Sequence, residues 1–387
     1  MTDLTMKAAG RRRGKKDEAS VYVASQWALI WRQFKKHRIA LVSLFVLAFL
    51  YLVALLAPFV APYNTATSFS RYTYAPPQMI KLIDVDEEGQ WRFAPYVNDY
   101  TVEIDPVGMR RSFVPDPQSR VYLKLFVTGD SYSFFGLNTN IHLFGTNDPN
   151  TPVFLLGSDR IGRDVFSRLA YATQISLSIG LVGVALSLTL GLTLGGISGY
   201  YGGTTDTVIQ RLIEFVRSMP TIPLWLGLAA AMPSDWGPLQ IYFALTIILS
   251  LVGWTGLARV VRGRFLSLRE EDFIRAAKLD GASEARIIVR HMMPAFTSHI
   301  IASVTLAIPF MIVAETALSF LGVGLRPPAV SWGTMLKDAQ SVRAVMSAPW
   351  MLAPAIPVVI SILAFNFLGD GLRDAADPYA AKSRGAR

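Results

Sequence analysis

Few residues of this 387-residue chain have types and spacing that could do chemistry. One candidate is a short run that alternates acids with arginines, and its members are Asp159, Gly162, Arg163, Asp164 and Arg168. These side chains could bind a charged ligand, or they could form ion pairs that cap the start of the apolar run that follows. We favour the second, architectural role.

Glu315 is another candidate, because it is an acid within an otherwise apolar run. An ionisable residue inside a membrane-spanning segment is by default a functional candidate, here for gating or for the substrate path. It lies toward one end of its predicted span, where water is near, so a solvated residue without such a role is the alternative.

Signatures of enzymatic chemistry are missing from the sequence. No G-x-x-x-x-G-K-[ST] phosphate loop occurs, and the nearest fragment, Gly10–Lys15, has the wrong spacing. The chain has no cysteine, and its four histidines are too scattered to suggest a metal cluster. Paired mid-span aspartates and an H-E-x-x-H motif are also missing. We therefore expect no catalytic residue, metal or cofactor in this chain, and no ATP hydrolysis by it.

The composition is that of a membrane protein. Hydrophobic residues make up 52% of the chain and charged residues only 17%, against roughly a quarter charged in an average soluble domain. The net charge is +9, and much of the excess precedes the first apolar run, where it suits an anionic membrane surface. Membrane lipid is therefore an expected partner, and nucleic acid is not.

Six apolar runs are long enough to predict transmembrane helices. The first, Ile39–Ala61, has about 23 residues without a charge, which is about 35 Å of helix against a hydrocarbon core of about 30 Å. The other five are Ser176–Tyr200, Leu212–Met232, Ile241–Ala258, Ser298–Leu321 and Trp350–Leu368. The expected fold is an all-α polytopic membrane protein with six transmembrane helices.

Lysine and arginine set the expected orientation. They are concentrated before the first run and in the loop after the fourth, and the positive-inside rule places both regions, with both termini, in the cytoplasm. The predicted segments are a basic cytoplasmic arm 1–38, a first span 39–61, an external insertion 62–172, a membrane domain 173–370 that includes a cytoplasmic loop 259–295, and a cytoplasmic tail 371–387.

The external insertion is too long to be an ordinary loop. Within it, Val121, Leu123, Leu125 and Val127 alternate along a predicted strand that ends at a turn, Thr128–Asp130. We expect a small β-containing unit between spans 1 and 2. Its aromatic residues either fill a small core or contact a ligand or a partner protein.

The loop 259–295, here called the arginine-rich loop, has the pattern of two short helices joined by a turn. A capping box at Ser267–Glu270 predicts a helix that runs through Ala277. Gly281 then supplies the left-handed conformation that ends a helix. Ser283 can cap a second helix, and Pro294 marks the next boundary.

Two alanines in this loop bear on its function. Ala276 and Ala277 present almost no side chain, so another protein surface could approach the backbone there. Such a loop would then be a docking site. The alternative is a basic amphipathic connector that only lies on the membrane surface.

Small residues repeat every four positions in the second predicted span. Gly191, Gly195 and Gly199 lie on one face of a helix, which favours close packing against another helix. That neighbour could belong to this chain or to a partner subunit.

The arginine-rich loop resembles the EAA loop of bacterial ABC importer permeases. That pattern is glutamate, alanine, alanine, three residues, glycine, nine residues, isoleucine, one residue, leucine and proline. Ala276, Ala277, Gly281 and Pro294 match it in place, whereas Arg275, His291 and Met293 replace its glutamate, isoleucine and leucine. The resemblance implies a role in coupling to ATPase subunits, carried here by Glu270, Glu271, Arg275, Ala276, Ala277, Gly281, Arg286 and Pro294.

Three further stretches, Leu156–Leu177, Ala314–Leu336 and Phe365–Tyr379, look like motifs of the C-type permease subunit of dipeptide and oligopeptide importers. This resemblance implies the type I ABC importer permease fold in a bacterial inner membrane. The implied partners are a second homologous permease subunit, two ABC ATPase subunits that bind ATP and Mg, and a periplasmic substrate-binding protein. The insertion is longer than in a typical peptide permease, and relatives in this family also import oligosaccharides, opine-like compounds or nickel, so those substrates stay open.

A different class of transporter is the alternative. An ion-coupled secondary carrier would need no ATPase, but the predicted spans lack the mid-membrane acidic or lysine relays and the inverted repeat of interrupted helices that such carriers use. The sequence therefore favours an external source of energy.

Overall fold

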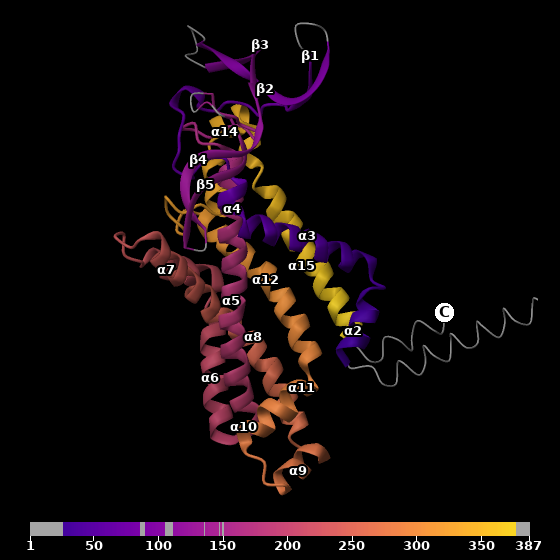
Figure 1. The fold of residues 1–387 in the computed structure, drawn as a ribbon. Coiled ribbons are helices and arrows are strands. Elements are labelled where there is room, and N and C mark those ends of the chain that lie inside the picture. The colour runs from indigo at the N-terminus through magenta and orange to yellow at the C-terminus, as the bar shows by residue number, and fades with distance from the viewer. Residues whose placement is uncertain are drawn as a thin grey trace, which may run out of the picture.

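The computed structural model describes residues 26–85, 90–104, 111–134, 136–146, 148 and 151–376. The first twenty-five residues of the predicted basic arm and most of the predicted tail lie outside these ranges. The chain forms an elongated helical bundle with short β-sheets at one end, here called the sheet end, and three short helices, α9 to α11, at the other, here called the loop end (Figure 1).

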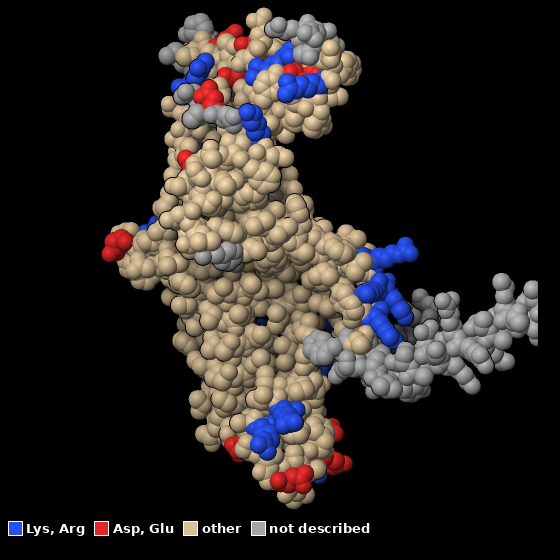
Figure 2. Space-filling model, in the orientation of Figure 1, with Lys and Arg blue, Asp and Glu red and all other residues tan. Residues whose placement is uncertain are grey.

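Five helical segments in the described part of the chain are long and apolar enough to cross a membrane. They are Arg38–Leu55 (α3), Val165–Tyr201 (α5), Pro238–Leu268 (α8), His299–Phe320 within α12 (Thr297–Phe320), and Pro349–Ala376, which contains η3 (Pro349–Leu352) and α15 (Ala355–Ala376). These segments coincide with five of the six predicted spans. On the face seen in Figure 2, a broad band largely free of charged side chains separates the charged residues of the two ends.

The predicted third span is not one helix. It is divided between α6 (Gly203–Ser218) and α7 (Thr221–Ala230), which leaves the bundle at an angle (Figure 1). Met219, at the break, is extended with ψ 136°, because Pro220 disfavours the helical conformation in the residue before it. The hydropathy of the run as a whole conceals this break, since it does not register one extended residue.

The first span is also shorter than predicted. Helix α3 ends at Leu55, and a separate short helix, α4 (Ala57–Val60), replaces its expected last turn. Pro58 explains the break, because it has no backbone N–H for the helical hydrogen bond and its ring collides with the preceding turn.

The glycine stripe of α5 packs within this chain, against α8. A Cβ on Gly195 would lie 2.5 Å from the carbonyl oxygen of Ala258, and one on Gly199 would lie 2.5 Å from Cβ of Phe265. A Cβ on Gly191 would meet the side chain of Leu257 at 2.9 Å. Of the two partners that the sequence left open for this stripe, the structure provides the neighbour in the same chain.

The two ends of the described chain lie on the same side of the bundle. The last turns of α15 lie beside α2 (Gln26–Phe34) and the start of α3, away from the β-strands (Figure 1). A Cβ on Gly371 of α15 would collide with Cβ of Ala40 in α3, so the backbones are in close contact there.

The predicted insertion contains the expected β-structure, in two antiparallel sheets. Strands β1 (Lys81–Val85), β2 (Trp91–Ile104) and β3 (Arg111–Tyr122) form one sheet in that order, and β4 (Lys124–Phe134) pairs with β5 (Leu137–Gly145) in the other. Between the end of α4 and α5, the short helix η1 (Ser70–Tyr72) and the segment 151–164 connect these sheets to the bundle.

Two details of that prediction are wrong. The chain passes from one sheet to the other at Leu123, so the alternation does not continue; Val121 and Val127 are buried whereas Leu125 is exposed. Strand β4 also runs through Thr128–Asp130, where the register shifts, and its hairpin turn comes later, before Leu137. An irregular strand can carry turn-forming residues, so composition alone cannot place its end.

Candidate functional site: a buried elbow and an exposed loop

The predicted group of acids and arginines forms a sharp elbow before α5. Asp164 is the N-cap residue of that helix, and its Oδ2 accepts hydrogen bonds from the backbone N–H and the hydroxyl of Ser167 at 2.7 and 2.6 Å. Gly162 has φ +81°, and a Cβ there would collide with the carbonyl oxygen of Phe69. A turn this tight against another segment requires glycine.

Asp159 is the centre of the elbow. Its carboxylate accepts from Arg163 Nε at 2.7 Å and from Arg168 Nη1 at 2.6 Å, and it also accepts from the backbone N–H groups of Ile161 and Arg163. Asp159 is 1% exposed, so these donors replace the water that its charge would otherwise require.

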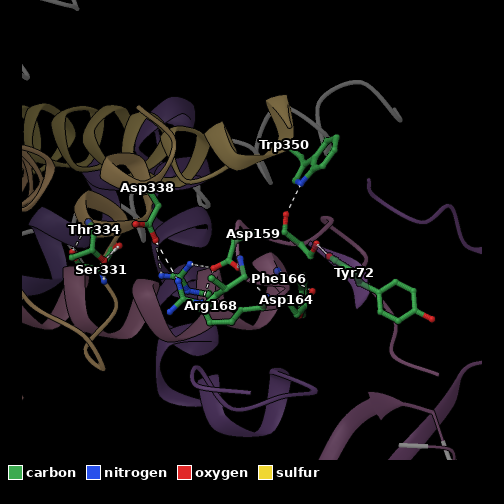
Figure 3. A network of polar contacts seen from close by, with 12 residues as sticks. Tyr72, Asp159, Asp164, Phe166, Arg168, Ser331, Thr334, Asp338 and Trp350 are labelled. Carbon is green, nitrogen blue, oxygen red and sulfur yellow. Dashed lines mark hydrogen bonds and ion pairs between the residues drawn. The ribbon is translucent and has the colours of Figure 1, made fainter. Parts of the chain in front are cut away.

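A third acid, which the sequence did not indicate, completes the elbow. Asp338 ends α13 (Trp332–Asp338), and its Oδ2 lies 3.2 Å from Arg168 Nη2 and 3.5 Å from Arg163 Nη2. Figure 3 shows Arg168 between Asp159 and Asp338, joining the start of α5 to a segment 170 residues later in the chain. No local spacing rule can find a partner at that separation.

Burial raises the pKa of the Asp164 carboxyl to about 6, despite the opposing effect of the hydrogen bonds from Ser167. The nearby carboxylate of Asp159 raises this pKa further. Desolvation therefore has a larger effect on Asp164 than its capping contacts.

Glu315 lies toward the end of α12, as predicted, but its side chain is 1% exposed, so it is buried rather than solvated. Its carboxylate accepts from the hydroxyls of Ser319 at 2.7 Å and Ser176 at 3.3 Å. Ser176 also accepts from the backbone N–H of Trp332 at 3.1 Å. Glu315 thus belongs to a hydrogen-bonded contact among α5, α12 and the start of α13.

The arginine-rich loop begins differently from the prediction. Helix α8 continues to Leu268, so Ser267 lies in its last turn and caps nothing. Helix α9 (Asp272–Leu279) follows, with Glu271 as its N-cap residue and no side-chain cap. Apolar residues continue along one face of α8 beyond the predicted span, and among them the buried Phe265 packs against α5. This packing outweighs the local capping signal.

Gly281 ends α9 as predicted. It has φ +76°, its N–H donates to the carbonyl oxygen of Lys278, and the N–H of Ala282 donates to the carbonyl oxygen of Ala277. This pair of hydrogen bonds is the Schellman ending of a helix. A second helical segment then follows as α10 (Glu284–Arg286), a wider π-helical turn (Ile287–Met292) and α11 (Met293–Ala295), but Ser283 makes no side-chain cap.

The loop has one buried face and one exposed face. Its buried apolar residues pack with the end of α8 and the start of α12, and the cluster consists of Val261, Phe265, Ile274, Ala277, Ile287, Met292 and Phe296. Ala276 is exposed, as are Phe273, Val289 and Leu279, which is 89% exposed. The other assigned residues Glu271, Arg286 and Pro294 are also exposed.

Comparison with known proteins identifies the family of this chain. The family model of the binding-protein-dependent transport system inner membrane component matches residues 191–382, and that of the N-terminal transmembrane domain of oligopeptide transport permease C matches residues 25–77. The dipeptide transport system permease protein DppC of Lactococcus lactis subsp. cremoris is 31% identical over 358 residues, covering 91% of this chain and 90% of that protein. The chain belongs to this permease family.

Two further similarities were found. The dipeptide transport system permease protein DppC of Alkalihalophilus pseudofirmus is 40% identical to the permease over 223 residues, which cover 57% of this chain and 71% of that protein. A solved structure of the MetNI methionine ABC transporter, in an inward-facing conformation, aligns with 54% of this chain and 96% of that chain, with 17% identity and a TM-score of 0.43.

Contacts that the sequence did not indicate attach the loop of the permease to its bundle. The hydroxyl of Tyr201, at the end of α5, donates to Glu284 Oε2 at 2.7 Å, and the ammonium of Lys278 lies 5.4 Å from the ring centre of Tyr200. Arg262 of α8 donates to both carboxylate oxygens of Asp206 in α6 at 2.5 Å. These pairs bring α5, α6, α8 and the loop together at one end.

Proposed function

We propose that this chain is the transmembrane permease subunit of an ATP-driven, binding-protein-dependent importer, and that it imports dipeptides or oligopeptides. The substrate class is supported by the relatives, which are named as dipeptide and oligopeptide transport system permeases. The chain itself is non-catalytic. Two separate ABC ATPase subunits bind ATP and Mg and hydrolyse the nucleotide.

The exposed face of the arginine-rich loop carries this proposal. Phe273, Leu279 and Val289 are apolar and exposed at the tip of the molecule, beyond the candidate spans, and Ala276 lies among them without a bulky side chain. Apolar side chains grouped on a polar surface are typical of a protein contact site. The ATPase subunits are the partners for this face.

The buried face of the same loop would transmit the motion of the ATPases. Ile274, Ile287 and Met292 are buried in one cluster with residues of α8 and α5, so a push on the exposed face cannot be absorbed by loosely packed side chains. ATP binding would draw the two ATPases together and turn the path outward, and hydrolysis would release them and turn it inward.

The proposed topology places the loop end in the cytoplasm of a bacterium and the sheet end in the periplasm, with the chain in the inner membrane. Arginines of the loop follow the positive-inside rule, and their positions are Arg259, Arg262, Arg264, Arg269, Arg275, Arg286 and Arg290. The contact between Gly371 and Ala40 places the end of α15 beside the start of α3, so one compartment, by the same rule the cytoplasm, would hold both termini. The substrate-binding protein would then dock at the sheet end.

The second homologous permease subunit would cover an apolar stripe on α6 and α7. Val208, Leu212 and Phe215 recur at helical spacing on α6, Ile222 continues them on α7, and all four are exposed in the single chain. The angle at which α7 leaves the bundle (Figure 1) suits an element that is held by a partner.

Reconstitution tests the function directly. The complete complex, with both permeases, both ATPases and the binding protein, is placed in proteoliposomes, and uptake of a radiolabelled dipeptide is measured with and without ATP. We expect ATP-dependent uptake that survives collapse of the ion gradients. Uptake that stops with the gradient would instead identify a secondary carrier.

A matched pair of variants tests the loop. Ala276→Asp places a charge against the ATPase without touching the buried face, and Ala276→Ser keeps the side chain small. We expect the first to lose most substrate-stimulated ATP hydrolysis and uptake while the complex still inserts, and the second to retain both. Normal rates in Ala276→Asp would mean that the loop is only a surface connector.

A further inference from the structure

A groove of about 860 Å³ opens at the sheet end, beside the elbow. Its lining residues come from the turn that carries Arg160 and from the segment between Leu325 and Ser341, which contains α13. Tyr74, from the chain before β1, also lines it. Apart from Arg168, the lining residues lie outside the candidate membrane spans, so the groove opens beyond the hydrocarbon region.

The groove has an excess of positive charge. Four of its lining residues are cations and one is an acid. Arg163 and Arg168 are already balanced by Asp159 and Asp338, as Figure 3 shows for Arg168.

The remaining two cations, Arg160 and Lys337, make no ion pair with an acid in the part of the chain that the structure describes. Two unbalanced cations that face one cavity attract an anionic group. An anionic ligand from outside this chain would balance these two cations.

The segment that carries Lys337 also supplies an apolar wall of the groove. Pro327, Pro328 and Val330 line it, and none of them has a flexible polar side chain. The wall is held in place because Trp332, directly after it, is fully buried and Ser331 caps α13 by accepting from the N–H of Thr334 at 3.3 Å. A ligand that matches both the cations and the apolar wall is an anion with an apolar body.

We propose that this groove binds the terminal carboxylate of a transported peptide at Arg160 and Lys337, with the last side chain of the peptide against Pro327, Pro328 and Val330. The inference rests on the proposed function, because it takes the cargo to be a peptide. It adds that the permease itself reads the free carboxylate after the binding protein has released the peptide. A phospholipid headgroup would offer the same anionic chemistry, and the experiment separates the two sources.

The test compares two probes, the dipeptide Ala–Phe and its C-terminal amide, in the reconstituted complex. In Arg160→Gln/Lys337→Gln we expect the KM for uptake of Ala–Phe to rise roughly tenfold, with little change for the amide. The same binding protein delivers the probes to the parent and to the variant complex. Its own preference between the two probes therefore cancels when the complexes are compared. The control, Arg92→Gln/Lys124→Gln, removes two exposed cations from the same end and should leave both KM values within about twofold of the parent.

A photoreactive residue identifies the occupant. Benzoylphenylalanine in place of Ser341, at the exposed rim of the groove, should label radioactive Ala–Phe in the parent complex and fail to do so in Arg160→Gln/Lys337→Gln. Labelling of phospholipid alone would overturn the proposal in favour of a headgroup site.

Other outcomes also decide the matter. An equal loss of Ala–Phe and amide uptake, or no loss of either, would contradict carboxylate recognition. Loss of copurification with the second permease would show that the cations hold that subunit instead. If the parent complex hydrolyses ATP but transports neither probe, the peptide cargo and this site are refuted together. If the parent transports both probes and the variant has the same KM values, only the site is refuted.

Discussion

The elbow and the arginine-rich loop are built from the same residue types but have opposite surroundings. In the elbow, Asp159 is 1% exposed and shared by two arginines. In the loop, the side chains of Glu270 and Arg275 form a pair at 3.1 Å that is 62% and 60% exposed. The comparison teaches that burial, rather than residue type, separates a group that holds the fold together from one that stays available to a partner.

The physical reason lies in the competition with water. A buried ion pair is weakly screened, and removing one partner leaves an uncompensated charge in a medium that cannot solvate it. An exposed pair loses little when it opens, because water replaces each partner. The loop can therefore exchange its internal contacts for contacts with an ATPase at small cost, and the elbow cannot exchange its own.

The largest expected effect comes from the elbow. Asp159→Asn removes one charge with little change of shape. Arg163 and Arg168 then share only Asp338 among the described acids, so one buried positive charge is left unbalanced. We expect a loss of about 3–5 kcal/mol in the free energy of unfolding, measured by thermal unfolding in detergent. The matched change in the loop, Glu270→Gln, should leave the unfolding midpoint almost unchanged, because water solvates both partners of that pair. Similar losses in both variants would abolish the distinction between the two regions.

A smaller effect is expected at Gly281, where the exposed loop needs a particular backbone conformation. Nothing lies within 4 Å of a Cβ added there, so Gly281→Val creates no collision, but its φ of +76° strains a branched residue. We expect a cost of about 1–3 kcal/mol, seen as a lower unfolding midpoint together with reduced uptake. Gly263→Val, in α8, has the same free space without the positive φ and serves as the control. If the two variants behave alike, the turn at Gly281 does not constrain the loop.

The smallest expected effect is a pH dependence at the elbow. The pKa of Asp164 is about 6 in the folded chain against an ordinary value of 3.8, so protonation favours the folded state. Stability from this group is present below pH 3.8 and is lost as the pH rises through 6. Lowering the pH from 7 to 5 should therefore add about 1.4 kcal/mol. Asp164→Asn, which cannot titrate, should remove this gain, and a gain of equal size in that variant would place its origin elsewhere.

Features that depend on neighbouring residues were predictable. Long apolar runs predicted five of the spans, and the glycine after α9 predicted where that helix ends. Local signals failed where tertiary packing competed with them. The capping box at Ser267–Glu270 is an example, because α8 extends through it when Phe265 packs against Gly199 of α5.

The sequence by itself determined the class of protein, the positions of most spans and the residues of the arginine-rich loop, because hydropathy and turn chemistry act between residues close along the chain. Only the tertiary structure decided that Asp338 completes the elbow, that the glycine stripe of α5 faces α8, and that Ala276 is exposed while Ala277 is buried. These outcomes depend on which distant segments come together to exclude water. A one-dimensional pattern records what each residue can do, and the packed structure determines which partner is within reach.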